Sequence, residues 1–241
     1  MKIPTISAKN LWHWGDLDIK DRYKNGLSLE GNLFSMSACP VAWRQIARLG
    51  GATLHIRNQP TELLDMLSIL GGTTHPGRHL RNVVEAWALS EKLVEYKDVY
   101  QIHEFDDELE DYRIMEFATL AEAENEAFEL DVEVTTVRKL IGTAALNKSH
   151  HHPESHLLGF EYALIDWAKV HLSDQIHGVY WDENLDPLDF SAPRAGMFDS
   201  QALGLTPALY VPDDEEALES ISKVRWINVK GLEPRDNEPA P

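Results

Sequence analysis

Hydrophobic and polar residues alternate in several short stretches of the chain, which is the pattern of β-strands with one buried face. In the first quarter the alternation covers residues 10–14 (NLWHW), 32–37 (NLFSMS) and 52–57 (ATLHIR). Later strands are predicted at 98–105, 111–119, 177–181, 206–211 and 223–229. We therefore expect a β-sheet at the centre of the fold.

Apolar residues spaced three and four apart predict helices between these strands. The helical spans are 40–51, 60–72, 77–96, 120–130 and 155–172. Pro40 begins the first span and Gly50-Gly51 end it, as is usual for helices. Thr119 and Glu122 form a capping box in front of the fourth. Because strands and helices do not alternate regularly, the expected fold class is α+β and not a parallel doubly wound sheet.

The length of 241 residues fits one domain with an insertion. We expect that domain to span residues 1–230, with an acidic insertion at about 104–133 and a mobile polar tail at 231–241. There is no long apolar segment and no secretory signal pattern, so the expected location is cytoplasmic, away from membranes. The only cysteine, Cys39, excludes an intramolecular disulfide.

The net charge of −18 is unevenly distributed along the chain. Residues 104–133 contain thirteen acids and one base, whereas residues 1–60 contain eight bases and four acids. A segment this acidic repels phosphates, which argues against nucleic-acid binding through it. Two interpretations stay open: the acids lie on a hairpin loop and the outer face of one helix, or they bind a protein partner.

The histidine-rich stretch KSHHHPESH (148–156) is a weak candidate for metal binding. His152 and His156 have the i, i+4 spacing of helical ligands, but Pro153 stands between them. We interpret the stretch as surface histidines and expect no metal. A metal-dependent hydrolase that uses His150, His152 and His156 is the alternative.

Motifs of common enzyme families are absent: there is no glycine-rich dinucleotide fingerprint, no Walker loop, no G-x-S-x-G and no H-E-x-x-H. Three separate features remain. His13 lies in a strand and is followed by Gly15; the run Phe34-Ser35-Met36-Ser37 precedes a helix; and Glu183 follows the apolar strand 177–181.

In their order and strand context, these residues resemble the toxin-like mono-ADP-ribosyltransferase family. The resemblance covers roughly residues 10–57 and 177–211. It implies a core of split, mixed or antiparallel β-sheets with flanking helices, and NAD as the co-substrate. The residues that it makes catalytic are Glu183, Ser35 and Ser37, and those that it makes NAD-binding are His13, Gly15, Phe34, Tyr180 and Arg194.

The chemistry of NAD cleavage agrees with this resemblance. Nicotinamide leaves a cationic bond as a neutral group, so one carboxylate is enough to offset the oxocarbenium-like charge on the ribose. Glu183 would supply it, Ser35 or Ser37 would steady that carboxylate, and His13 would bind a ribose hydroxyl. Tyr180 or Trp181 would stack on nicotinamide.

One departure from the family pattern qualifies the expected acceptor. Trp181 stands two residues before Glu183, where the arginine-modifying branch has Glu or Gln, so arginine is disfavoured as the acceptor. Arg194 is predicted in a loop at 188–201, where it would contact the acceptor, reach a phosphate or pair with Asp186 or Asp189.

The function expected from the sequence is therefore transfer of ADP-ribose from NAD to a protein or nucleic-acid acceptor. Two alternatives stay open. One is a non-enzymatic acidic interaction or inhibitor protein that acts through residues 104–133. The other is a protein of the same fold that binds or hydrolyses NAD without transfer.

Overall fold

The computed structural model describes residues 3–8, 11–14, 33–37, 52–70, 77–106, 111–150, 159–184, 191–198, 204–211 and 229–230. The predicted helix 40–51, Cys39 and the tail 231–241 lie outside these residues. The chain has an α+β fold, as predicted. It divides into two compact units: the first comprises Met1–Glu85 with Leu164–Pro241, and the second comprises Ala86–Ala163.

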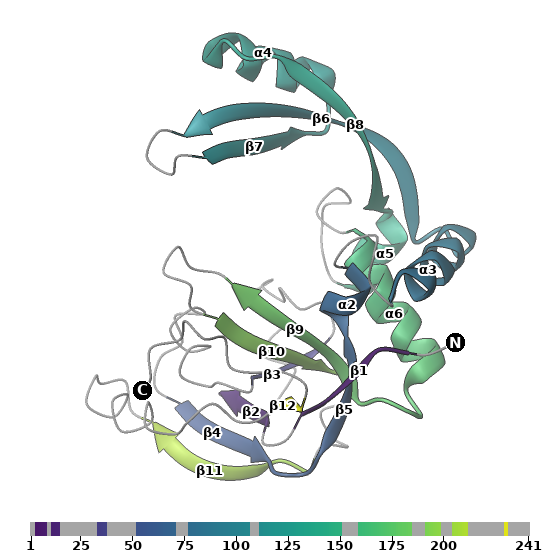
Figure 1. Ribbon diagram of the computed structural model, residues 1–241, viewed down its shortest axis with the longest axis vertical. Coiled ribbons are helices and arrows are strands. Elements are labelled where there is room, and N and C mark those ends of the chain that lie inside the picture. Colours follow the sequence, from purple (N-terminus) through teal and green to yellow (C-terminus); the bar gives the residue numbers. More distant parts are fainter. Residues whose placement is uncertain are drawn as a thin grey trace. The chain divides into compact units, whose positions relative to one another are not determined.

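In the described part of the first unit, nine strands form a curled, mixed sheet in the order β11-β4-β2-β3-β10-β9-β5-β1-β12 (Figure 1). Neighbouring strands are antiparallel except for β5 and β9, which are parallel. The strands are β1 (Thr5–Ala8), β2 (Leu11–Trp14), β3 (Phe34–Ser37), β4 (Ala52–Arg57), β5 (Thr61–Asp65), β9 (Gly178–Asn184), β10 (Ser191–Met197), β11 (Thr206–Val211) and β12 (Val229–Lys230).

One face of this sheet forms an apolar core. The core side chains come from β1, β2, β3, β5, β9 and β10, so distant parts of the sequence meet there. They are Ile6, Ala8, Leu11, Phe34, Met36, Leu63, Tyr180, Ala195 and Met197. Burial of these groups is the main source of stability for the sheet.

Two predicted helices are shorter than expected because part of each is a strand. Residues 60–72 contain strand β5, followed by the short helix α2 (Met66–Leu70). Residues 77–96 contain helix α3 (Arg78–Ser90), and strand β6 begins at Val94. Apolar runs such as Leu63-Leu64 are buried on both faces, and their spacing alone does not separate helix from strand.

The predicted loop at 188–201 is wrong over residues 191–197, which form β10. This strand lies between β3 and β9 and pairs with both. Arg194 is therefore a strand residue and not a loop residue. Of the strand predicted at 223–229, only the last residue lies within the described β12.

Helix α6 (Phe160–Leu172) confirms the C-terminal part of the helix predicted at 155–172. Its apolar residues Ala163, Leu164, Ile165 and Ala168 are fully buried. Lys169 lies on the same helix, and burial lowers the pKa of its ammonium group, while Asp166 acts in the opposite direction. Charged Lys169 is thus less favourable in the folded state than in the unfolded state.

We expect replacement of Lys169 with methionine to raise the free energy of unfolding at pH 7. A lowered folded-state pKa means that the unfolded chain binds more protons between that pKa and 10.5, so wild-type stability rises with pH across this interval. The advantage of the variant should therefore shrink toward pH 10.5. Urea unfolding of both proteins as a function of pH measures this, and an advantage that does not change with pH would contradict it.

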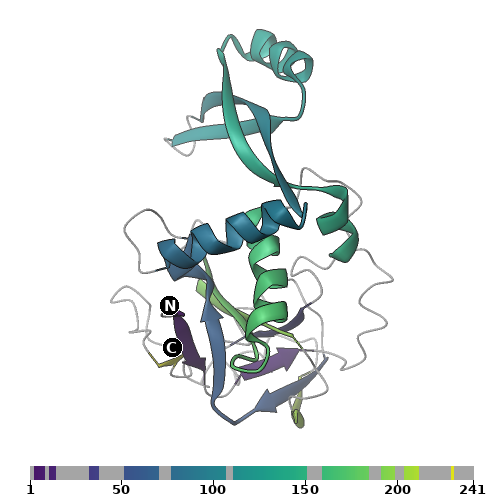
Figure 2. The same cartoon turned by 90° about the vertical axis from the view of Figure 1, so that its right-hand side faces the viewer.

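The second unit contains a three-stranded antiparallel sheet in the order β7-β6-β8. Its strands are β6 (Val94–Asp106), β7 (Asp111–Phe117) and β8 (Val134–Gly142), and its helices are α4 (Leu120–Leu130) and α5 (Ala144–Ser149). Helix α4 lies across one face of the sheet (Figure 1). Figure 2 shows that β6 continues from α3 and that β8 leads into α5. A small apolar cluster of Ala88, Val94, Leu146 and Ala163 joins these ends.

Thr119 caps the N-terminus of α4, as predicted, and its side chain is hydrogen-bonded to that of Glu122. The backbone N–H of Glu122 donates to Thr119 Oγ1 at 3.3 Å, and the Thr119 hydroxyl donates to the Glu122 carboxylate at 2.7 Å. Strand β8 and helix α5 were not among the predicted elements.

In the described part of the chain, no helix has the length and apolar character needed to cross a membrane.

Candidate functional site

The strands that carry the sequence-predicted site residues are neighbours in the first unit. β2 carries His13, β3 carries Phe34, Ser35 and Ser37, and β9 carries Tyr180 and Glu183. They follow one another in the sheet as β2-β3-β10-β9, with Arg194 on the strand in between. The sheet therefore collects four segments that span almost the whole sequence.

One register row crosses these four strands. Trp12 pairs with Ser37, Ser37 with Arg194, and Arg194 with Trp181. Residues opposite each other in a sheet lie on the same face, so these side chains share one face. We call it the serine face. Ser35 is two residues from Ser37 and pairs with Gly196, so it belongs to the same face. The Trp181 ring lies close to Gly196, since a Cβ atom at this glycine would be only 3.1 Å from the ring.

Arg194 and Trp181 make a direct contact on the serine face. The Arg194 guanidinium carbon lies 4.4 Å above the centre of the Trp181 ring, and both residues are buried. A guanidinium stacked on an indole is held in a fixed orientation by its cation-π attraction. The row thus places a buried positive charge beside the fully buried Ser37.

The backbone of Glu183 lies in β9, two residues beyond Trp181, and pairs with Ala192 of β10. Position 183 therefore has the same phase of the β9 alternation as Trp181, which pairs with Arg194. The strand ends at Asn184.

His13 belongs to the opposite face, together with Phe34 and Tyr180. It pairs directly with His55 of β4 and packs against the Phe34 ring at 4.2 Å. Its Nδ1 lies 2.8 Å from the carbonyl oxygen of Ser35. Because a carbonyl only accepts hydrogen bonds, Nδ1 carries the proton and donates it. His13 therefore fixes the backbone of β3 from behind the serine face.

Two buried basic residues near His13 were not predicted as site residues. The His55 ring lies 6.2 Å from the His13 ring, and Arg57 donates from Nε to the Thr61 hydroxyl at 2.7 Å. Burial lowers the pKa of Arg57 below its ordinary value. The alternation in ATLHIR places His55 and Arg57 on the same face of the strand. This pattern could have identified the two residues from the sequence.

The predicted site residues thus fall into two groups. Ser35, Ser37 and Arg194 lie on the serine face, whereas His13, Phe34 and Tyr180 lie on the opposite face. Gly15 lies outside the described residues.

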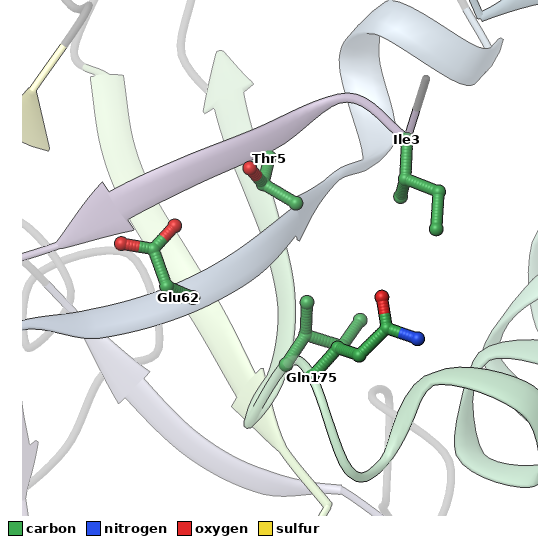
Figure 3. A pocket seen from close by; sticks show the side chains of 5 residues that line it. Ile3, Thr5, Glu62 and Gln175 are labelled. Carbon is green, nitrogen blue, oxygen red and sulfur yellow. The ribbon is translucent and has the colours of Figure 1, made fainter. Parts of the chain in front are cut away.

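A separate pocket of about 320 Å³ opens beside β1 and β5. It is lined by Ile3, Thr5, Glu62, Gln175 and Ile176, and Figure 3 shows the Thr5 hydroxyl, the Glu62 carboxylate and the Gln175 amide around it. A carboxylate, a hydroxyl and an amide can hold a small polar molecule by hydrogen bonds. None of the residues predicted from the sequence lines this pocket.

The histidine-rich stretch lies mostly outside the described residues, which include His150 but not His152 or His156. His150 is fully buried and packs edge-on against Tyr162, with ring centres 5.0 Å apart. Within the described ranges, no group of three His, Cys, Asp or Glu residues is arranged to hold a metal ion.

Comparison of the chain with known proteins finds no matching family model and no significant match among curated proteins or solved structures.

Proposed function

We propose that this protein is an NAD-dependent mono-ADP-ribosyltransferase whose core is the nine-stranded sheet of the first unit. The resemblance of the His13, Ser35–Ser37 and Glu183 segments to that family suggests the activity. The observation that carries the proposal is the row Ser37–Arg194–Trp181, with position 183 in phase with it on β9. A hydroxyl, a guanidinium and an aromatic ring then belong to one face of one sheet, and the backbone of Glu183 has the same phase on β9.

In the proposed reaction, the bond between the nicotinamide nitrogen and C1′ of the ribose breaks. Its electron pair leaves with nicotinamide, and positive charge develops on the ribose ring. The Glu183 carboxylate offsets this charge and accepts a hydrogen bond from a ribose hydroxyl. A nucleophile of the acceptor then bonds to C1′ and loses its proton. No second carboxylate is required, since nicotinamide departs as a neutral molecule.

The other residues of the serine face have roles that follow from their chemistry. The family resemblance assigns Ser35 or Ser37 to orient the Glu183 carboxylate. The register favours Ser37, because Ser35 lies in line with Gly196 and Val179, four residues before Glu183. Arg194 supplies a positive charge for the pyrophosphate of NAD, and Trp181 holds the guanidinium in place.

We assign His13 a positioning role, because its Nδ1 bond holds the Ser35 carbonyl. Direct binding of a ribose hydroxyl by His13 stays a prediction of the family resemblance.

Variants of His13 separate these roles. We expect His13→Ala to raise the Kd for NAD about tenfold, which corresponds to the loss of one buried hydrogen bond. We expect His13→Asn to stay within about threefold of wild type, because its amide nitrogen can still donate to the Ser35 carbonyl. Isothermal titration with NAD measures both values. If His13→Asn binds NAD as weakly as His13→Ala, the ring contacts the dinucleotide and the positioning role is wrong.

The proposed function itself is tested by release of nicotinamide from NAD by the purified full-length chain, followed by chromatography. Time-dependent release above the rate in buffer alone supports it. Absence of release at saturating NAD, with and without a cell lysate as the source of acceptor, would refute it.

A further inference from the structure

The pocket beside β1 and β5 lies on the face of these strands that is opposite the apolar core. Ile6 of β1 and Leu63 of β5 belong to that core. Their neighbours Thr5 and Glu62 have the other phase of the alternation. Thr5 pairs with Leu64, two residues beyond Glu62, so Thr5 and Glu62 are diagonal neighbours on one face. Diagonal side chains can both contact a molecule that lies between them.

A second wall of the pocket is the segment that follows α6. The backbone N–H groups of Gln175 and Ile176 donate to the Leu172 carbonyl oxygen at 2.8 and 2.9 Å, which closes the end of the helix. The next N–H, that of His177, donates to the Glu62 carbonyl oxygen at 2.8 Å. Because these bonds hold Gln175 and Ile176 on both sides, the fold itself fixes this wall, as is usual for sites that bind small molecules.

The wall formed by the start of β1 is held in the same way. The backbone N–H of Asp65, at the end of β5, donates to the Pro4 carbonyl oxygen at 3.1 Å. Pro4 stands between Ile3 and Thr5, the two pocket residues of this segment. All walls of the pocket thus belong to the first unit and are joined by backbone hydrogen bonds.

The polar lining carries a negative charge and three groups that accept hydrogen bonds. An ionised Glu62 carboxylate only accepts, and the Thr5 hydroxyl and the side-chain carbonyl of Gln175 can each accept as well (Figure 3). None of the five lining side chains is basic, so an anionic ligand would be repelled. None is aromatic, so a quaternary ammonium would find no ring to stack on. A primary ammonium group has three N–H donors and no acceptor, which matches this lining.

The size and the apolar lining limit the rest of the ligand. The volume of about 320 Å³ is at the small end for pockets that bind small molecules. Ile176 is buried and Ile3 is half-buried, and both offer methyl groups to an alkyl chain. Thr5 and Gln175 are exposed, so the pocket can be reached from solvent. A short alkyl chain therefore fits beside the ammonium group.

We propose that this pocket is a binding site for a small primary amine in its ammonium form. The Glu62 carboxylate accepts one charged N–H bond, and the Thr5 hydroxyl and the Gln175 carbonyl accept the other two. Ile3 and Ile176 contact the alkyl chain. The inference is independent of the NAD chemistry proposed for the serine face.

The test measures binding of n-butylammonium to the full-length chain by isothermal titration, in an amine-free buffer at constant ionic strength. Butyrate and tetramethylammonium are the comparison probes, because butyrate has the opposite charge and tetramethylammonium has the same charge without an N–H donor. We expect saturable binding of one butylammonium per chain and no binding of the other two. Absence of saturable butylammonium binding, or equal binding of tetramethylammonium, would overturn the proposal.

Variants of the lining locate the bound amine. We expect Glu62→Gln to weaken butylammonium binding at least about tenfold, because the charged hydrogen bond is lost. We expect Thr5→Val to weaken it about threefold or more, because a neutral hydrogen bond is lost while the shape of the side chain is kept. Circular dichroism confirms that each variant is folded. Unchanged binding in Glu62→Gln would place the amine elsewhere and overturn the proposal.

Asp174→Asn is the matched control for Glu62→Gln. Asp174 is an exposed acid next to Gln175 in the chain, and it does not line the pocket. Since the salt in the buffer screens exposed charges, this variant should bind butylammonium within about twofold of wild type. Equal losses in Asp174→Asn and Glu62→Gln would indicate a general attraction of cations to an acidic chain and would also overturn the proposal.

Discussion

Replacement of Glu183 with glutamine is expected to slow nicotinamide release from NAD by at least about 100-fold, the loss typical for removal of one transition-state-stabilising group. The amide has nearly the volume of the carboxylate but no negative charge to offset the oxocarbenium-like ribose. Folding should be preserved because the substitution adds no atoms to the strand. The rate is measured at saturating NAD, so that a change in NAD affinity does not contribute.

Asp182→Asn is the matched control for this variant. Asp182 is the adjacent residue of β9 and pairs with Pro193, so it has the opposite phase of the alternation from position 183. It should release nicotinamide at the wild-type rate. Equal losses in the two variants would indicate a general effect of charge at the strand end, and a wild-type rate in Glu183→Gln would show that the catalytic assignment is wrong.

Gly178→Ala is expected to lower the stability of the first unit strongly. A Cβ at Gly178 would overlap the carbonyl oxygen of Gly196 and lie 2.9 Å from Cα of Met197. Both are backbone atoms of β10, so no side-chain rotation relieves the overlap, and the strands must move apart. Overpacking of this kind costs about 1–3 kcal/mol of the free energy of unfolding, and more where only backbone atoms are in contact. Urea unfolding followed by tryptophan fluorescence measures the loss.

Gly159→Ala is the control for this prediction. The nearest heavy atom to a Cβ at Gly159 is the Leu140 carbonyl oxygen at 3.7 Å, an ordinary contact distance. The variant should unfold within about 0.5 kcal/mol of wild type, as is usual for substitutions that disturb no packing. A Gly178→Ala protein as stable as Gly159→Ala would mean that β9 and β10 are not packed at Gly178 as described.

Local signals in the sequence predicted much of the secondary structure. The strands at 11–14, 34–37 and 52–57 each have a recognisable pattern of apolar and polar residues. The helix at 120–130 has its own capping residues. These features depend on neighbours within a few residues, so the sequence alone contains them. The α+β class followed from their order.

β10 could not be predicted from its local sequence, because its residues fit contacts with neighbouring strands that are distant in the sequence. The strand SAPRAGM has proline and glycine inside it and no apolar-polar alternation. It lies between two strands in the middle of the sheet, where Ala195 and Met197 are buried on one face and Arg194 on the other. A strand covered on both faces loses the alternation that reveals half-buried strands.

The composition of the candidate site was only partly predictable for a related reason. The sequence indicated His13 and Ser35 as strand residues and Glu183 as a residue just after a strand, whereas β9 extends to Asn184. The face to which each position belongs depends on the pairing of distant strands. A shift of one residue in register exchanges the faces. The same pairing brought Arg194 onto Trp181, a contact between residues that the sequence had assigned to a loop and a strand.

Transfer of label from adenine-labelled NAD to macromolecules in a cell lysate distinguishes the proposed transferase from its alternatives. We expect a labelled protein or nucleic-acid band with the wild-type chain and with Asp182→Asn, and none with Glu183→Gln. Release of nicotinamide without a labelled band would identify an NAD hydrolase. A wild-type chain that neither binds NAD nor labels any macromolecule would contradict the proposed function.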